Sequence, residues 1–178
     1  MVSSNIEKSG TDTGAIGQQI CDPPLACVHC LAASALTAEL TDSEITALFK
    51  VVDIRRLSKG EVLISEGEQD DRIYAIARGE FEVARGESAD REVQLTHLRP
   101  GTIAGELAFL DGLKRTATVR AATDGACAIA LRRKDLESML TANPTIPYRI
   151  MTAAIRSAHR TVGKMDAVHL DMIRYIQG

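Results

Sequence analysis

Two side chains of opposite charge, Glu106 and Arg115, lie nine positions apart around a short turn. They belong to residues 105–119, Gly-Glu-Leu-Ala-Phe-Leu-Asp-Gly-Leu-Lys-Arg-Thr-Ala-Thr-Val. An arginine guanidinium stays charged at any working pH and binds phosphate through paired hydrogen bonds, and a carboxylate accepts hydrogen bonds from sugar hydroxyls. The pair therefore indicates a site for a phosphate beside a ribose. A surface ion pair across a hairpin is the alternative interpretation.

The residues at the start of this segment favour close approach of the backbone to an anion. Gly105 has no side chain, so a ligand can come near the main chain there. Residues 106–109, Glu-Leu-Ala-Phe, can form one helical turn whose first amide hydrogens have no partner within the helix and point toward an anion. The segment thus predicts an amide-lined turn facing a single guanidinium.

The same residues closely resemble the phosphate-binding cassette of cyclic nucleotide-binding domains, a family that includes catabolite activators and the regulatory segments of cyclic-nucleotide-dependent kinases and channels. The resemblance covers about residues 36–165. Upstream it includes short stretches that are similar to the early strands of that domain: Lys59–Ile64, Glu66–Glu68, Ile73–Ile76 and Gly79–Val83.

The resemblance implies a role for each cassette residue. Glu106 would bond the ribose 2′-hydroxyl, Arg115 would neutralise the cyclic phosphate, and amides near Leu107 and Ala108 would donate to it. Thr116 could bond the phosphate or, as in members that favour cyclic GMP, the guanine amino group. The ligand is therefore expected to be cAMP or cGMP, with the choice of purine open. A pocket that no longer binds nucleotide, on a domain kept for protein interaction, is an alternative.

Composition limits the other classes of function. The chain has 178 residues, 45% apolar and 25% charged, and 24 acidic residues against 21 basic ones leave it slightly negative. It has no basic field for nucleic acid, no apolar run of about twenty residues and no secretory signal pattern. We expect a cytoplasmic protein without membrane contact. No set of nucleophile and base is recognisable, so we expect no enzyme activity.

The pattern along the chain predicts a mainly β fold with flanking helices, a double-sheet jelly roll followed by a long helix. Thr41 and Glu44 form a capping box at the start of a first helix, expected within 36–53. Short alternating runs punctuated by glycines then fill residues 54–131. The expected domains are a disordered leader (1–20), a cysteine-bearing segment (21–35), the jelly roll with its N-terminal helix (36–143) and the long C-terminal helix (144–178).

The C-terminal helix carries an apolar seam in alternating steps of four and three, which is typical of helices that pair. We expect a homodimer through it, although packing on its own roll is the alternative. In the resembling activator family this helix covers the nucleotide base, and Thr161 matches its adenine-contacting threonine. The seam consists of Met151, Ile155, Ala158, Val162, Met165, His169, Met172 and Ile176.

Activator-type relatives continue into a helix-turn-helix domain, whereas this sequence stops at Gly178. We therefore expect a stand-alone sensor without direct DNA binding, in which the ligand moves the C-terminal helix and so changes a surface for an unknown downstream protein partner.

Four cysteines give a rival hypothesis. Cys21, Cys27 and Cys30 cluster ahead of the roll, His29 lies between the last two, and Cys127 follows much later. Four thiols could hold an iron-sulfur cluster, and three thiols with His29 could hold zinc. The arrangement partly resembles that of the fumarate and nitrate reduction regulators, with the order of the cysteine spacings reversed. A redox sensor on the same fold is therefore the second prediction.

Overall fold

Two antiparallel sheets and five helices make up the part of the chain that the computed structural model describes, which is residues 25–86 and 92–177, with side chains over 28–86 and 92–163. In chain order the elements are α1 (Leu25–Ala32), α2 (Asp42–Phe49), β1 (Asp53–Leu57), β2 (Val62–Ile64), β3 (Arg72–Arg78), β4 (Phe81–Arg85), β5 (Val93–Leu98), β6 (Ile103–Ala104), α3 (Glu106–Asp111), β7 (Thr118–Ala121), β8 (Ala126–Arg132), α4 (Arg133–Ser138) and α5 (Thr145–Gln177).

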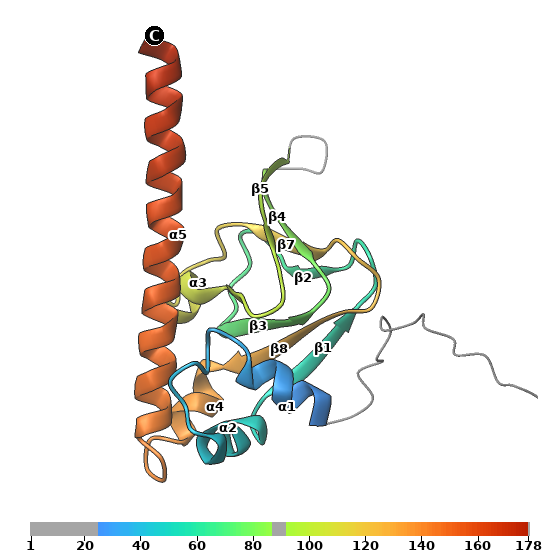
Figure 1. Cartoon of the computed structure of the whole chain (residues 1–178), viewed down its shortest axis with the longest axis vertical. Coiled ribbons are helices and arrows are strands. Elements are labelled where there is room, and N and C mark those ends of the chain that lie inside the picture. The colour runs from blue at the N-terminus through green and yellow to red at the C-terminus, as the bar shows by residue number, and fades with distance from the viewer. Residues whose placement is uncertain (1–24, 87–91, 178) are drawn as a thin grey trace, which may run out of the picture.

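The strands form two four-stranded sheets, in the orders β1-β8-β3-β6 and β2-β7-β4-β5. All of their pairings are antiparallel, and in the first sheet Tyr74 of β3 lies opposite Ala130 of β8. Figure 1 shows the sheets facing each other beside the long helix α5, with α1, α2 and α4 gathered at one end. The predicted jelly roll with flanking helices is therefore confirmed.

Alternation along β3 and β8 divides the core into two layers. Ile73, Ala75 and Ile129 point to the side that the helices cover, whereas Tyr74 and Ala128 point into the space between the sheets. Because successive side chains of a strand face opposite sides, a strand that is covered on both sides is apolar throughout. This explains why residues 73–77 and 126–131 are buried without interruption.

The predicted capping box at the start of α2 is present. The side chain of Thr41 accepts a hydrogen bond from the Glu44 amide, and the Glu44 side chain accepts one from the Thr41 amide. The helix is shorter than the sequence predicts, because residues 33–40 form turns. There the Thr37 hydroxyl donates to the carbonyl of Leu31, and such local bonds compete with helix formation.

Helix α1 was not predicted; it covers the middle of the cysteine-bearing segment, and its Leu31 is fully buried. The expected disordered leader lies outside the described residues. Within the described part, none of the helices is both long and apolar enough to span a membrane.

Helix α5 has 33 residues, which corresponds to about 50 Å at a rise of 1.5 Å per residue. Its first half packs on the roll through Ile146, Ile150 and Ala154, which are fully buried. An ion pair of 2.6 Å between Arg149 and Glu44 joins it to α2. Figure 1 shows that the other half of α5 continues beyond the roll.

Candidate functional site

The site begins where β6 ends and α3 starts. Gly105 precedes α3 in a left-handed conformation with a φ of 77°, which side chains rarely tolerate. A Cβ at this position would lie 3.2 Å from the Arg72 carbonyl oxygen and would overlap the Arg115 guanidinium. Glycine is therefore required both by the backbone conformation and by the packing of the arginine beside it.

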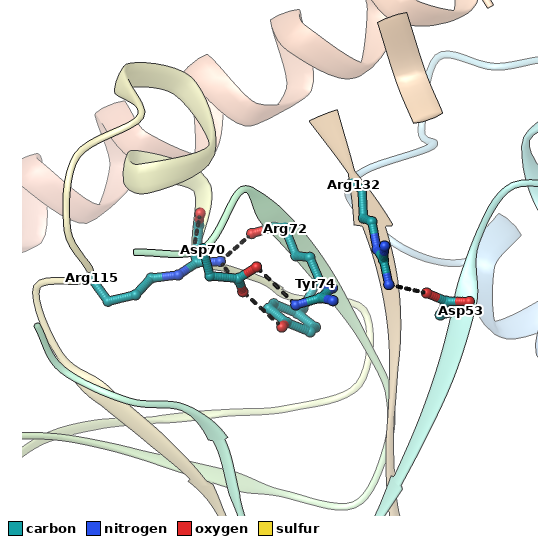
Figure 2. Close-up of polar contacts among 7 residues, drawn as sticks. Asp53, Asp70, Arg72, Tyr74, Arg115 and Arg132 are labelled. Carbon is teal, nitrogen blue, oxygen red and sulfur yellow. Dashed lines mark hydrogen bonds and ion pairs between the residues drawn. The ribbon is translucent and has the colours of Figure 1, made fainter. Parts of the chain in front are cut away.

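The guanidinium of Arg115 points inward, and the residue is only 4% exposed. Its Nη1 donates to the carbonyl of Gly105 at 2.8 Å, and its Nη2 donates to Asp70 Oδ2 at 2.8 Å and to the Arg72 carbonyl at 2.5 Å. Figure 2 shows these contacts beneath α3, with the Tyr74 ring beside them. The Nε atom is buried and has no acceptor among the described residues. A buried unpaired donor is costly, so an anion at Nε would stabilise this arrangement.

The main chain of Arg115 is fixed as well. Its amide donates to the carbonyl of Glu68 at 2.8 Å, and its carbonyl accepts from the Gly67 amide at 2.9 Å. These residues belong to the loop between β2 and β3, which also carries Asp70. One loop therefore positions both the backbone of Arg115 and the carboxylate that holds its side chain.

Asp70 is the centre of a small network that the sequence did not predict. Its Oδ1 accepts from Arg72 at 2.9 Å, and its Oδ2 accepts from Arg115 and, at 3.1 Å, from the Tyr74 hydroxyl. Burial opposes ionisation of Asp70. The hydrogen bond and the charge of Arg115 favour the ionised form, and the charge of Arg72 and the Tyr74 hydroxyl add smaller contributions in the same direction. Together they hold the pKa of Asp70 below its ordinary value.

Glu106 is buried, at 7% exposure, at the first position of α3. Its Oε1 accepts a hydrogen bond of 2.9 Å from the hydroxyl of Thr161 on α5. The Thr161 hydroxyl also lies 3.1 Å from the carbonyl of Ser157 in its own helix. The structure thus brings together two residues that the sequence analysis assigned to the ribose and to the base of one ligand, and α5 contacts α3 through them.

The other predicted contact residues differ in how far they are exposed to solvent. Leu107 is half-buried and Ala108 is buried on α3, whereas Thr116 is exposed beside the arginine. The Ala108 carbonyl accepts from Arg133 at 3.3 Å, which ties the end of α3 to the start of α4. A cavity of about 360 Å³ opens next to the site, lined by Gln69, Asp70, Asp71, Gly112 and Arg133.

The cysteine prediction is only partly covered by the structure. Cys30 on α1 is half-buried and packs against the core layer that contains the buried Cys127 of β8. Cys21 and the side chain of Cys27 lie outside the described part. Among the side chains that the structure describes, no three His, Cys, Asp or Glu residues are placed to hold a metal ion. The cluster or zinc site stays a prediction, and iron and zinc analysis of the anaerobically purified full-length chain tests it.

Sequence comparison identifies the class of protein. The family described as "Cyclic nucleotide-binding domain" matches residues 54–143, just over half of the chain. The chain therefore belongs to the cyclic nucleotide-binding domain family.

Individual relatives come from bacterial regulators and from kinases. A "CRP-like cAMP-activated global transcriptional regulator" of Mycobacterium tuberculosis is 29% identical over 143 residues, which are 80% of this chain and 63% of the relative. A "cGMP-dependent protein kinase egl-4" of Caenorhabditis briggsae is 40% identical over 86 residues, 48% of this chain and 11% of the kinase. The chain thus spans less than two thirds of the length of these relatives.

Solved structures agree with the fold. The N-terminal domain of a transcriptional regulator from Streptomyces coelicolor is 31% identical with a TM-score of 0.63, and the match covers 74% of this chain and 94% of that one. A cyclic nucleotide-binding domain from Methylobacillus flagellatus, 17% identical, has a TM-score of 0.72 over 82% of this chain and 84% of its own. The second similarity concerns the fold alone.

Proposed function

We propose that the chain is a regulatory domain that binds cAMP or cGMP, with Arg115 holding the cyclic phosphate and Glu106 the ribose. The observation that carries the proposal is the buried guanidinium of Arg115, whose Nη1 and Nη2 atoms are held by protein oxygens while its Nε has no acceptor among the described residues. Family membership supports it. In this reading the protein transmits a signal and performs no catalysis.

The relatives include both a cAMP-activated regulator and a cGMP-dependent kinase, so the preferred purine is determined by titration. Leu107 and Ala108 would present main-chain amides to the phosphate. Thr116, exposed beside the arginine, would be reached by the ligand from the solvent side.

The Thr161–Glu106 hydrogen bond supports a coupling between the ligand and α5. A ribose hydroxyl that bonds Glu106 must compete with Thr161 for the same carboxylate or share it. Binding would thereby change how α5 is held over α3. A ligand can shift such an equilibrium only by its difference in affinity for the two arrangements. The 2.9 Å hydrogen bond between Thr161 and Glu106 is the contact at which the two arrangements would differ.

The exposed side of α5 supports a homodimer. Tyr148, Ile155 and Val162 are 72%, 57% and 50% exposed and recur every seven residues. At about 100° per residue they lie on one side of the helix, roughly opposite the buried Ile150 and Ser157. The predicted seam thus includes Ile155 and Val162 on the side that does not pack on the roll, while its positions from 165 onward lie outside the described side chains.

Calorimetric titration of the full chain with cAMP and with cGMP tests the nucleotide proposal. We expect binding of at least one, and its loss in Arg115→Ala and Arg115→Lys, because lysine keeps the charge but not the fork. Arg132→Ala is the matched control, since Arg132 forms only a 3.6 Å pair with Asp53 among the contacts described for its side chain. Absence of binding by the wild type to either nucleotide would refute the proposal.

A further inference from the structure

Asp70 is a negative charge directly beside the proposed phosphate-binding group, and the sequence pattern did not point to it. Its carboxylate lies 2.8 Å from Arg115 Nη2, and only 13% of its side chain is exposed. Its Oδ1 accepts one hydrogen bond, from Arg72, and its Oδ2 accepts two, from Tyr74 and Arg115. Figure 2 shows the carboxylate between the two guanidinium groups.

The hydrogen bonds of Arg115 fix where an incoming anion can bind. Both hydrogens of Nη2 are matched by Asp70 Oδ2 and the Arg72 carbonyl, and one hydrogen of Nη1 is matched by the Gly105 carbonyl. The donors that remain are Nε and the second hydrogen of Nη1. A phosphate can therefore bind the same guanidinium while Asp70 keeps its place, and two anions then share one cation.

The electrostatic balance of this cluster depends on Asp70. Arg72 and Arg115 contribute two positive charges and Asp70 one negative charge, so the three groups together carry one net positive charge. The repulsion between Asp70 and a ligand is proportional to the charge of the ligand. A cyclic phosphodiester carries one negative charge, whereas a phosphate monoester carries nearly two above its second pKa of about 6.

We propose that Asp70 is a specificity-determining residue that selects singly charged cyclic phosphates over doubly charged phosphate monoesters. This inference rests on the proposed function, because it assumes that Arg115 binds the nucleotide phosphate. Asp70 lowers the affinity for every anion at Arg115, and it lowers the affinity for a dianion by about the square of the factor for a monoanion. The open-chain nucleotide, which shares the base and the ribose, is rejected through its charge.

The experiment compares cAMP with adenosine 5′-monophosphate on the full chain at pH 8 and low salt, where the monoester is a dianion and screening is weak. Affinities are measured by titration and by competition against a labelled cyclic nucleotide. Asp70→Asn keeps the shape and an acceptor oxygen but removes the charge, and Asp70→Ser is a second neutral variant. If the wild type prefers cGMP, guanosine 5′-monophosphate replaces the adenosine compound.

Two control variants separate charge from position. Asp53→Asn removes one negative charge from the exposed pair with Arg132, which Figure 2 shows away from Arg115. Tyr74→Phe removes a donor to Asp70 but leaves the carboxylate in place. Neither control is expected to change the ratio of the two affinities, since the charge beside Arg115 stays in both.

We expect Asp70→Asn to bind the cyclic nucleotide at least about threefold more tightly and the monoester at least about tenfold more tightly. The ratio of the affinity for the cyclic nucleotide to that for the monoester should therefore fall. An unchanged or larger ratio of the two affinities overturns the inference. It is also overturned if the monoester displaces the labelled cyclic nucleotide from neither the wild type nor Asp70→Asn. An equal fall of this ratio in Asp53→Asn would also overturn the inference. A wild type that binds no cyclic nucleotide refutes the proposed function instead, which keeps the two failures distinguishable.

Discussion

The hydroxyl of Thr161 on α5 lies 2.9 Å from the Glu106 carboxylate on α3, although the two residues are 55 positions apart. This contact joins the long helix to the turn that begins the cassette. Because Glu106 is buried, its carboxylate depends on protein donors for the hydrogen bonds that it has lost from water. The contact therefore both stabilises the fold and places α5 directly beside the proposed ribose position.

Thr161→Val tests this contact, since valine keeps the shape and removes the donor. We expect the free energy of unfolding to fall by about 1.5–3 kcal/mol, the usual range for a hydrogen bond to a charged group. Without a cyclic nucleotide, the backbone amides of α3 and α5 should exchange their hydrogens faster in this variant than in the wild type. Thr152→Val is the matched control, because the Thr152 hydroxyl bonds only the Tyr148 carbonyl of its own helix among its described contacts. Equal effects of both variants would contradict a special role for Thr161.

Gly105→Ala should destabilise the fold and abolish nucleotide binding. The residue has a left-handed φ, and a Cβ there would overlap the guanidinium of Arg115. Gly60→Ala is the matched control, because Gly60 has a φ of 84° but nothing within 4 Å of the added Cβ. Both should lose about 1–2 kcal/mol from the backbone conformation, and only Gly105→Ala should lose more from the displaced arginine. Urea denaturation measures the difference, and equal losses would argue against the packing role.

Much of the fold and part of the site were predictable because their signals are local. The capping box of Thr41 and Glu44 spans four residues, and the turn from Gly105 into α3 is encoded by consecutive residues. The long helix α5 follows from helical periodicity. In each case neighbouring residues in the sequence determine the geometry, so the pattern alone is informative.

The remainder depends on contacts across the fold. Asp70 and Arg115 are 45 residues apart, and no spacing shows which of the adjacent residues Asp70 and Asp71 turns toward the arginine. The pairing appears only when the loop before β3 is bonded to the main chain at Arg115. Helix α1 was missed for a similar reason, since its eight residues are stabilised by packing of Leu31 rather than by a clear start signal.

The stability of the chain in acid should depend on Asp70. Its pKa lies below the ordinary value of 3.8, so the ionised carboxylate stabilises the fold above about pH 4. That contribution is lost as the pH falls through the folded pKa. Asp70→Asn should therefore be less stable than the wild type at pH 5–7, and the difference should shrink toward pH 2. Urea denaturation across this range measures it, with Asp53→Asn as the control for net charge. A difference that stays constant would contradict the linkage.

The apolar side of α5 leads to the last prediction, that Ile155→Glu yields a monomer. Ile155 is 57% exposed and lies between Tyr148 and Val162 on the side of the helix away from the buried Ile150. A charge at the centre of a helix–helix contact would be buried without a partner, and this costs several kcal/mol. Because the position is open in the isolated chain, the fold itself should be unaffected. Analytical ultracentrifugation measures the mass, and circular dichroism confirms the helix content.

Leu140→Glu is the matched control for this experiment, because Leu140 is 52% exposed and lies outside α5. It should remain dimeric at the same concentration. If the wild type is already a monomer at the highest concentration reached, or if Ile155→Glu stays a dimer, the exposed stripe of α5 does not join two copies. A dimer that survives Ile155→Glu but dissociates in Leu140→Glu would place the interface at the α4 end of the roll instead.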